Sequence, residues 1–344
     1  MKNKDLKILL VGAGAVGGIT AALLKRDGYN VEIVCKHDDY AEMINHQGLS
    51  VNGVAGSFKI IVPAYSSAGN IVEKKDLILL ATKTNDMADA VRSVLPLLKE
   101  DGNIIALQNG MFEEDLIGIA GAAKTAGCIT GWGATMEKPG DLYMTSRGDF
   151  ILGYPYRAPD EKLDQIAQVL SSVVPSRTTD NFIGHQYSKL IINSCITSLG
   201  AVCGLFLGKM LSEKKIRNIF IEIMTEAILV ADALNIKVEV FGGRLDFYKF
   251  LHSSGMLSEI KRHLFIIIIG FKYRNLKSSS LQSLSRGKQT EIEYLNGYIV
   301  RMGKAKGINV PVNETIVKMV HEIENKRRNI SESNFADPIF DRFN

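Results

Sequence analysis

The chain has few of the residues that mark several classes of protein. Its 344 residues include only 4 cysteines, 8 prolines and 1 tryptophan, and 41 basic against 37 acidic residues leave a net charge of +4. Glycine has no three-residue period, so the chain is not collagen-like, and 46% hydrophobic residues exclude a disordered chain. No basic cluster is interleaved with aromatic residues, which argues against nucleic-acid binding. The length then predicts a globular protein of about two domains.

The cysteines and the apolar runs bear on compartment and membrane. No CxxC pair or Cys/His cluster with zinc spacing occurs, so we expect no metal site and free thiols in a reducing cytoplasm. The most apolar run, Phe265–Phe271, is far shorter than the roughly 20 residues that span a bilayer, so we expect no membrane span. Such a run indicates a buried helix or an apolar contact surface. The stretch Leu264–Phe271 is therefore our candidate contact of a homodimer.

The first half of the chain alternates apolar runs with amphipathic stretches, the pattern of a parallel sheet with helical crossovers. Helices are predicted at Ala15–Asp27 and Met87–Leu98, and Thr130–Gly153 is expected to be rich in strands. The stretch Gly48–Pro63 predicts an antiparallel hairpin with Asn52-Gly53 as its turn. Buried strands are predicted at four continuous apolar runs: Lys7–Val11, Val31–Cys35, Asp76–Thr82 and Asn103–Leu107.

The second half is predicted to be helical, with almost no strand pattern. The expected helices are Asn181–Leu207, Glu213–Leu234, Val240–Phe250, Thr290–Lys306 and Asn313–Lys326. The predicted organisation is an α/β nucleotide-binding domain at 1–178, an all-α substrate domain at 179–330 and a polar tail at 331–344.

A glycine-rich turn follows the first predicted strand. Gly12, Gly14 and Gly17 fit the pattern GxGxxG between that strand and the first predicted helix. There the first glycine permits a tight turn, the second lets a pyrophosphate approach the backbone, and the third lets the helix pack close to the strand. This use of the N-terminal run also excludes a signal peptide. The sequence predicts a Rossmann-type dinucleotide site formed by Gly12, Ala13, Gly14, Ala15, Val16 and Gly17.

The end of the second predicted strand bears on the choice of cofactor. A site that prefers NAD places an Asp or Glu there to bind the ribose hydroxyl. Here the strand ends in Cys35-Lys36-His37, and Lys36 suits a 2′-phosphate, although Asp38 and Asp39 follow closely. We therefore expect NADP rather than NAD, with an ordinary solvated lysine as the alternative interpretation of Lys36.

Four further segments occur in a characteristic order. They are Ala81-Thr82-Lys83, then Leu107–Met111 (LQNGM), then Ser188–Asn193 (SKLIIN), and finally Ser278–Gln282 (SSSLQ) with Thr290–Gly297 (TEIEYLNG). Over nearly its whole length the chain resembles the ketopantoate reductases (2-dehydropantoate 2-reductases). The resemblance implies reduction of a small 2-oxo acid by NADPH, namely ketopantoate to (R)-pantoate on the route to pantothenate and coenzyme A.

The resemblance also implies roles for particular side chains. Lys189 is the expected general acid, and Glu291 is expected near it, where the carboxylate orients the ammonium or binds a substrate hydroxyl. Asn193 lies four residues after Lys189 and shares its helix face, from which it can bind substrate. Ser279 is expected to bind the substrate carboxylate, and Asn109 is expected at the junction of cofactor and substrate. Lys83 is expected to bind the NADP phosphate. Asn109 and Glu291 are expected to contact both substrate and cofactor.

Several alternatives remain open. Where family members often carry a second asparagine, this chain has Thr197, and Gln282 is followed by Ser283 rather than aspartate. Both changes fall near the expected substrate site, and the chain also has extra material at 241–274 and at the C-terminus, so a related reductase of another 2-oxo or 3-hydroxy acid is the second hypothesis. A non-catalytic dinucleotide sensor is the third. By pattern alone, Lys189 and Glu291 are ordinary solvated helix residues. The active site is expected between the two domains.

Overall fold

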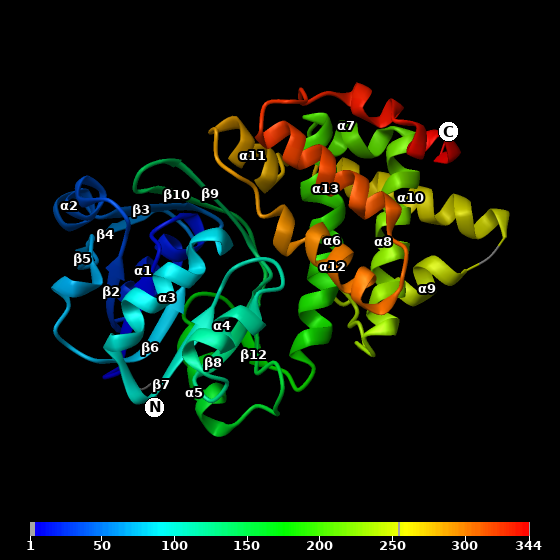
Figure 1. The fold of residues 1–344 in the computed structure, drawn as a ribbon. Coiled ribbons are helices and arrows are strands. Elements are labelled where there is room, and N and C mark those ends of the chain that lie inside the picture. The colour runs from blue at the N-terminus through cyan, green and yellow to red at the C-terminus, as the bar shows by residue number, and fades with distance from the viewer. Residues whose placement is uncertain (1–3, 254, 344) are drawn as a thin grey trace. The chain divides into compact units, whose positions relative to one another are not determined.

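In the computed structural model, which describes residues 4–253 and 255–343, the chain divides into two units, Met1–Phe182 and Ile183–Asn344. The first unit contains the strands and the second is helical (Figure 1). The predicted fold class, an α/β Rossmann-type domain followed by an all-α domain, is confirmed. Among the described residues, no helix has both the length and the apolarity needed to cross a bilayer.

The main sheet of the first unit has the strand order β12-β11-β8-β7-β6-β1-β2-β5. β1 pairs in parallel with both β2 and β6, so the strand order reverses beside β1. The first strand is buried on both faces, since Ile8, Leu9 and Leu10 are fully inaccessible. The strands of this main sheet are β1 (Lys7–Val11), β2 (Asn30–Val34), β5 (Ala64–Tyr65), β6 (Lys75–Leu80), β7 (Leu98–Ala106), β8 (Thr125–Thr130), β11 (Phe150–Gly153) and β12 (Ser176–Thr178).

A second sheet of the first unit has the order β4-β3-β10-β9, formed by β3 (Leu49–Gly53), β4 (Phe58–Ile60), β9 (Gly133–Lys138) and β10 (Asp141–Ser146). The predicted hairpin is confirmed, because β3 and β4 are antiparallel. Its predicted turn at Asn52-Gly53 is wrong. Gly53 belongs to β3, where a Cβ would lie 2.2 Å from the Met144 carbonyl oxygen of β10. The glycine there permits close approach of two strands rather than a turn.

The helices of the first unit include the two predicted crossovers. They are α1 (Ala15–Arg26), α2 (Asp38–Gln47), α3 (Met87–Val94), α4 (Glu113–Ala120) and α5 (Glu161–Leu170).

The second unit consists of helices α6 to α13, with one short 3₁₀ segment between α11 and α12 and two more after α13. The α-helices are α6 (Phe182–Cys203), α7 (Leu207–Ser212), α8 (Lys214–Ala233), α9 (Phe247–His252), α10 (Met256–Lys272), α11 (Ser279–Ser285), α12 (Asn296–Lys306) and α13 (Pro311–Glu324). The 3₁₀ segments are η4 (Ile292–Tyr294), η5 (Glu332–Ala336) and η6 (Pro338–Phe343). In the segment predicted as a polar tail, Phe335 and Phe340 are buried.

Two predicted helices of the second unit differ from the structure. The helix expected at Val240–Phe250 forms only its end, since Phe241 and Leu245 make an isolated antiparallel bridge and α9 begins at Phe247. The helix expected at Thr290–Lys306 is divided into η4 and α12, because Leu295 adopts φ −111° and ψ −106°, outside the helical region.

A buried polar network joins four helices of the second unit. Glu226 on α8 accepts hydrogen bonds from the backbone N–H groups of Val312 and Asn313, both at 2.9 Å, and from the Asn313 amide at 2.7 Å. The Asn313 side-chain oxygen accepts from Asn296 of α12 at 2.9 Å, and Asn296 accepts from Ser198 of α6. Burial raises the pKa of Glu226 despite these donors. The network fixes the start of α12 against α6, the helix that carries the predicted proton donor.

Candidate active site

The glycine-rich turn has the geometry that the motif predicts. Gly12 has φ +100°, and a Cβ there would lie 2.8–2.9 Å from the backbone of Ala81 and Thr82. A Cβ on Gly17 would lie 2.0 Å from the Gly12 carbonyl oxygen and 2.8 Å from the Ala81 methyl group. At Gly14, by contrast, no described atom outside its own neighbourhood lies within 4 Å of such a Cβ. The turn is therefore closed toward the sheet and open on the side where a pyrophosphate would approach.

The N-terminus of α1 completes a cradle for phosphate. Gly14 is the N-cap residue of α1 and provides no side-chain cap for the first N–H groups of the helix. The hydroxyl of Tyr40 on α2 donates to the Ala13 carbonyl oxygen at 2.7 Å, which fixes the turn from its other side. Open space beside Gly14 and uncapped N–H groups fit the pyrophosphate of a dinucleotide.

Two lysines follow neighbouring parallel strands. Lys36 comes after β2, its side chain is 77% exposed, and its Nζ lies 3.6 Å from Asp86 Oδ1. Lys83 follows β6, is exposed, and precedes the 3₁₀ segment Thr84–Asp86. Both lysines therefore lie at the carboxyl edge of the sheet, on either side of the strand that leads into the glycine-rich turn.

Asn109 follows β7 at the same edge of the sheet and is half-buried. Its backbone carbonyl oxygen accepts from the Thr84 hydroxyl at 3.0 Å. The preceding Gln108 donates from its amide to the Thr82 hydroxyl at 2.9 Å. These two bonds tie the loop after β7 to the loop after β6. The first unit thus brings its predicted cofactor residues to the ends of neighbouring strands.

The predicted substrate residues of the second unit follow one another along α6. Lys189, Asn193 and Thr197 are four residues apart, so they share one face of this helix. Lys189 and Asn193 are half-buried and Thr197 is buried. The Thr197 hydroxyl donates to the backbone carbonyl of Asn193 at 2.6 Å. Because that bond uses its proton, the hydroxyl oxygen is left to act as an acceptor.

The serine segment docks beside Thr197. The Ser278 hydroxyl donates to the Thr197 carbonyl oxygen at 3.3 Å and accepts from the Leu281 N–H at 3.2 Å, which caps α11. A Cβ on Gly200 would lie 2.6 Å from Ser278 Oγ, so the glycine allows this approach. Ser279 is the first residue of α11 and is half-buried, between the buried Ser278 and Ser280. The fold thus brings the segment of Ser279 onto α6. The bond that joins them, from Ser278 to Thr197, connects residues that are 81 positions apart in the sequence.

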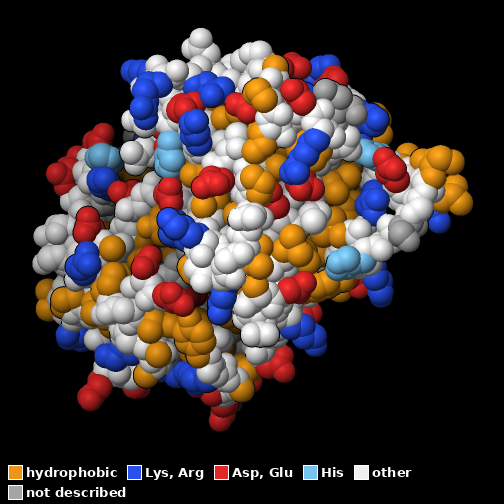
Figure 2. Space-filling model, turned by 45° about the vertical axis from the view of Figure 1, so that its right-hand side comes forward, with side chains coloured by type: hydrophobic (Ala, Val, Ile, Leu, Met, Phe, Trp, Pro, Cys, Tyr) orange, Lys and Arg blue, Asp and Glu red, His pale blue; other side chains and the backbone are white. Residues whose placement is uncertain are grey.

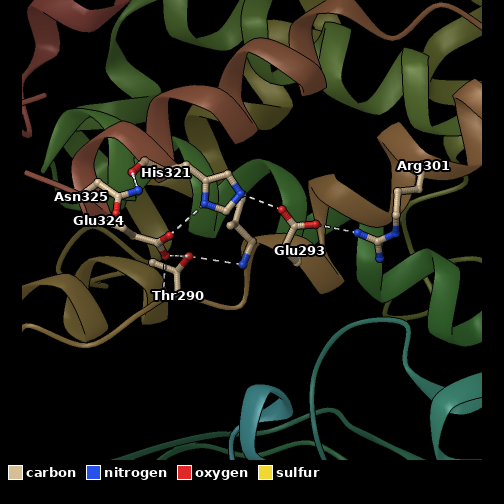
Figure 3. Close-up of polar contacts among 7 residues, drawn as sticks. Thr290, Glu293, Arg301, His321, Glu324 and Asn325 are labelled. Carbon is tan, nitrogen blue, oxygen red and sulfur yellow. Dashed lines mark hydrogen bonds and ion pairs between the residues drawn. The ribbon is translucent and has the colours of Figure 1, made fainter. Parts of the chain in front are cut away.

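Glu291 is not the exposed helix carboxylate that its sequence pattern alone suggests. It is 9% exposed and immediately precedes η4. The adjacent Thr290 donates from both its backbone N–H and its hydroxyl to Oε1 of Glu324, each at 2.7 Å (Figure 3). The Thr290 hydroxyl also accepts from the N–H of Ile292 at 3.2 Å. These bonds hold the backbone on both sides of Glu291.

A histidine completes this arrangement. His321 on α13 lies between two carboxylates, with Nδ1 at 3.0 Å from Glu324 and Nε2 at 2.6 Å from Glu293 (Figure 3). The other oxygen of Glu293 accepts from Arg301 of α12 at 2.6 Å. Burial of the ring lowers the pKa of His321, but its hydrogen bonds to Glu293 and Glu324 outweigh burial, so the pKa is raised overall.

This arrangement predicts a pH-dependent stability. Since the folded protein favours the protonated ring of His321, the stabilisation is complete below the unfolded pKa of about 6.5 and is lost as pH rises through the raised folded pKa. We expect His321→Gln to flatten the fall of Tm with pH in this window. Thermal unfolding at a series of pH values measures the effect. The matched variant His46→Gln, at the exposed end of α2, should retain the wild-type slope, and an unaltered slope in His321→Gln would contradict the interpretation.

Both halves of the chain match one protein family. Residues 8–156 match the family described as Ketopantoate reductase PanE/ApbA, and residues 181–324 match its C-terminal counterpart, Ketopantoate reductase PanE/ApbA C terminal. The chain belongs to the ketopantoate reductase family. The resemblance inferred from the sequence motifs is therefore confirmed.

Similar proteins cover nearly the whole chain. The 2-dehydropantoate 2-reductase of Pyrococcus abyssi (strain GE5 / Orsay) is 29% identical over 310 residues, which are 90% of this chain and 94% of the relative. The crystal structure of a PanE/ApbA family ketopantoate reductase from Ralstonia eutropha JMP134 is 27% identical, with a TM-score of 0.80 over 94% of this chain and 100% of that chain. The ternary structure of D-mandelate dehydrogenase with NADH and anilino(oxo)acetate shares the fold at 22% identity, with a TM-score of 0.79 over 93% and 99%.

Some residues that contact the predicted site residues were not singled out from the sequence. Tyr40 bonds to the glycine-rich turn, and Thr84 bonds to the backbone of Asn109. Glu324, which His321 contacts, holds the backbone beside Glu291. The sequence carries only a weak pattern for these residues, because a tyrosine or a threonine near a turn has no fixed spacing to its hydrogen-bond partner. The Thr82 and Gln108 pair, by contrast, lies within motifs that the sequence already marked.

Proposed function

We propose that the protein reduces 2-dehydropantoate (ketopantoate) to (R)-pantoate with NADPH, as a cytoplasmic enzyme of pantothenate and coenzyme A biosynthesis. The observation that carries the proposal is the row Lys189, Asn193 and Thr197 on α6, with the Ser279 segment docked beside it. This row occurs in a chain whose two halves match the ketopantoate reductase family and whose relatives include named 2-dehydropantoate 2-reductases.

Each residue has a distinct part in the proposed reaction. Lys189 donates a proton to the carbonyl oxygen of the 2-oxo acid, and its ammonium stabilises the charge that develops there. Asn193, one turn along α6, donates a hydrogen bond to the substrate, and Ser279 binds its carboxylate. Glu291 orients the ammonium of Lys189 or accepts from a substrate hydroxyl. Bound NADPH supplies the hydride to the carbonyl carbon.

The predicted cofactor-binding residues also have separate roles in the proposal. Gly12, Gly14 and Gly17 shape the backbone cradle for the pyrophosphate, and Lys36 and Lys83 provide cations for the 2′-phosphate of NADPH. Asn109 is proposed to contact the cofactor beside the substrate.

Thr197 favours a second candidate function, the reduction of a different 2-oxo acid. Its hydroxyl donates to Asn193 within α6, so it presents only an acceptor to a ligand, whereas an asparagine amide would present two donors as well. A substrate with a hydroxyl that needs an acceptor fits this position. A substrate that needs a donor there does not.

A panel of 2-oxo acids tests the proposal. Purified protein should oxidise NADPH fastest with ketopantoate, measured by the loss of NADPH absorbance, and the product should be (R)-pantoate by chiral chromatography. Faster turnover of another 2-oxo acid would favour the second candidate. NADPH binding without turnover of any acid in the panel would reject both.

The cofactor preference gives a separate prediction. Lys36→Ala should lower the ratio of NADPH to NADH efficiency by roughly tenfold or more, since a charge-assisted bond to phosphate contributes about 1.5–3 kcal/mol. Asp86→Asn should raise the same ratio, because Asp86 competes with the phosphate for Lys36 at 3.6 Å. Initial rates with both cofactors measure it, with Lys59→Ala on β4 as the control. A ratio unchanged in Lys36→Ala would refute the assignment.

A further inference from the structure

Five polar side chains of the second unit form a continuous series of contacts (Figure 3). Arg301 of α12 donates to one oxygen of Glu293, and the other oxygen of Glu293 lies 2.6 Å from Nε2 of His321. Nδ1 of His321 lies 3.0 Å from one oxygen of Glu324, whose other oxygen accepts from Thr290 at 2.7 Å. The series therefore joins α12, η4 and α13 through one imidazole ring.

The segment that carries Glu291 is held through this ring at both of its ends. Thr290, immediately before Glu291, is bonded to Glu324, which contacts the ring. Glu293, two residues after Glu291, contacts the other side of the ring of His321. Because the segment is only four residues long, its contacts at the two ends determine where the buried side chain of Glu291 lies.

The two ring nitrogens of His321 face one carboxylate each. A protonated imidazole carries a proton on both nitrogens and donates to both carboxylates, whereas a neutral ring carries one proton and turns a lone pair toward the other carboxylate. Protonation also balances the charges, because two cations, His321 and Arg301, then face two anions, Glu293 and Glu324. Loss of the proton therefore weakens one of the two contacts and leaves a net negative charge.

The ring of His321 can exchange its proton with solvent, since its side chain is 38% exposed. Its charged neighbours are Glu293 of η4, Glu324 of α13 itself and, through Glu293, Arg301 of α12. The carboxylate that α8 contributes to α13, Glu226, binds instead at the start of that helix. Figure 2 shows acidic and basic side chains intermixed on the face that it draws, and the net charge of the chain is only +4. Close neighbours therefore govern the charge of the ring more than the field of the whole protein does.

We propose that His321 is a positioning residue of the reduction, which in its protonated form holds both ends of the segment 290–293 and thereby fixes the carboxylate of Glu291. The proposal rests on the proposed function, in which Glu291 orients the ammonium of Lys189 or accepts from a substrate hydroxyl. Deprotonation of the ring releases one end of the segment. Glu291 then loses its position, and turnover slows.

The pH dependence of kcat tests the role of the ring. Since the pKa of His321 is raised above 6.5, wild-type kcat should be highest below the raised pKa and should fall as pH rises through it. His321→Gln should lower kcat at acidic pH by roughly tenfold, because a displacement of about 1 Å near the reacting atoms costs up to about 10²-fold, and the fall should be absent. His321→Lys, whose ammonium can donate to both carboxylates and stays charged to about pH 10, should restore kcat and move the fall to higher pH.

Two further variants distinguish positioning from a general loss of structure. Glu322→Gln removes another ion pair of α13, with Arg328 at 2.6 Å, and should keep the wild-type pH profile. In a Glu291→Gln background, His321→Gln should change kcat by less than about twofold, because residues that act through one another are not additive. Full additivity of these two changes, or a pH profile of His321→Lys identical to that of the wild type, would overturn the proposal.

NMR of the full chain separates this proposal from the proposed function. The ring resonances of His321 report its protonation, and the backbone amide of Thr290 reports the bond to Glu324. Both should titrate with one midpoint, and His321→Gln should abolish the transition at Thr290. An amide of Thr290 that does not respond to the ring would overturn the coupling even if ketopantoate is reduced. A shared midpoint in a protein that turns over no 2-oxo acid would support the coupling and reject the proposed function.

Discussion

Alanine in place of Lys189 is expected to lower kcat with ketopantoate by roughly 10²–10⁴-fold, the range that a positioned proton donor contributes. Lys189 is the only Lys or Arg along α6, all of which the structure describes. The residues that follow Lys189 on the same face, Asn193 and Thr197, carry no proton that is acidic near neutral pH, whereas His185 lies one turn before it. Neither Asn193 nor Thr197 can therefore replace the lost donor. Steady-state kinetics should show a smaller effect on KM than on kcat.

Two further variants separate proton donation from other effects. Lys189→Arg keeps the positive charge but holds its proton too tightly to release it, so it should retain much of the substrate affinity while kcat stays low. Lys304→Ala, at an exposed position of α12, should behave as the wild type. NADPH binding, followed by the fluorescence of the cofactor, should be unaffected in all three variants. A wild-type kcat in Lys189→Ala would remove Lys189 from the mechanism.

Alanine at Gly14 and at Gly17 should separate cofactor binding from folding. A methyl group at Gly14 contacts no described atom within 4 Å, so Gly14→Ala should leave Tm unchanged. The same methyl group fills the space in which a pyrophosphate would approach, and the Kd for NADPH should rise by roughly tenfold or more. Calorimetric unfolding and titration with NADPH measure the two quantities.

Gly17→Ala should instead destabilise the protein. Its methyl group would lie 2.0 Å from the Gly12 carbonyl oxygen, so α1 must move away from the sheet. Overpacking of this kind costs about 1–3 kcal/mol, and each kcal/mol lowers Tm by about 2–4 °C in a domain of this size. Cofactor binding should weaken as well, because α1 carries the phosphate cradle. A Gly14→Ala variant with a lowered Tm and unaltered NADPH affinity would contradict this division of roles.

The parts of the fold that could be predicted are those in which burial of an element requires a particular pattern of apolar residues. Parallel strands covered on both faces need unbroken apolar runs, so β1 was predicted with its observed bounds, Lys7–Val11. The parallel pairing of β3 with β10 left no local trace, because it joins segments about 90 residues apart, and Gly53 was assigned to a turn instead. The break before α12 was missed for a similar reason. The segment before the break is held by bonds from Thr290 to Glu324, 34 residues further on.

Only those parts of the candidate site that belong to short sequence motifs could be predicted. The glycine-rich turn combines three positions whose roles follow from sterics, and the structure reproduces the crowding at Gly12 and Gly17 and the open space at Gly14. The burial of Glu291 and the internal bond of the Thr197 hydroxyl could not be derived from helical periodicity. Each depends on a side chain's immediate surroundings, which a pattern of polar and apolar residues does not specify.

The strand order described above has a consequence for aggregation. Exposed sheet edges are templates on which further strands can add, and short or charged edge strands discourage this. The main sheet ends in β5 (Ala64–Tyr65) and β12 (Ser176–Thr178), its two shortest strands among the described residues, and β12 carries Arg177. On the second sheet one edge strand, β4, has only three residues and contains Lys59, whereas the other edge strand, β9, has six residues and ends in Glu137 and Lys138. In a nascent first unit, β9 is therefore the edge most open to other unfolded chains before the helical half has been synthesised.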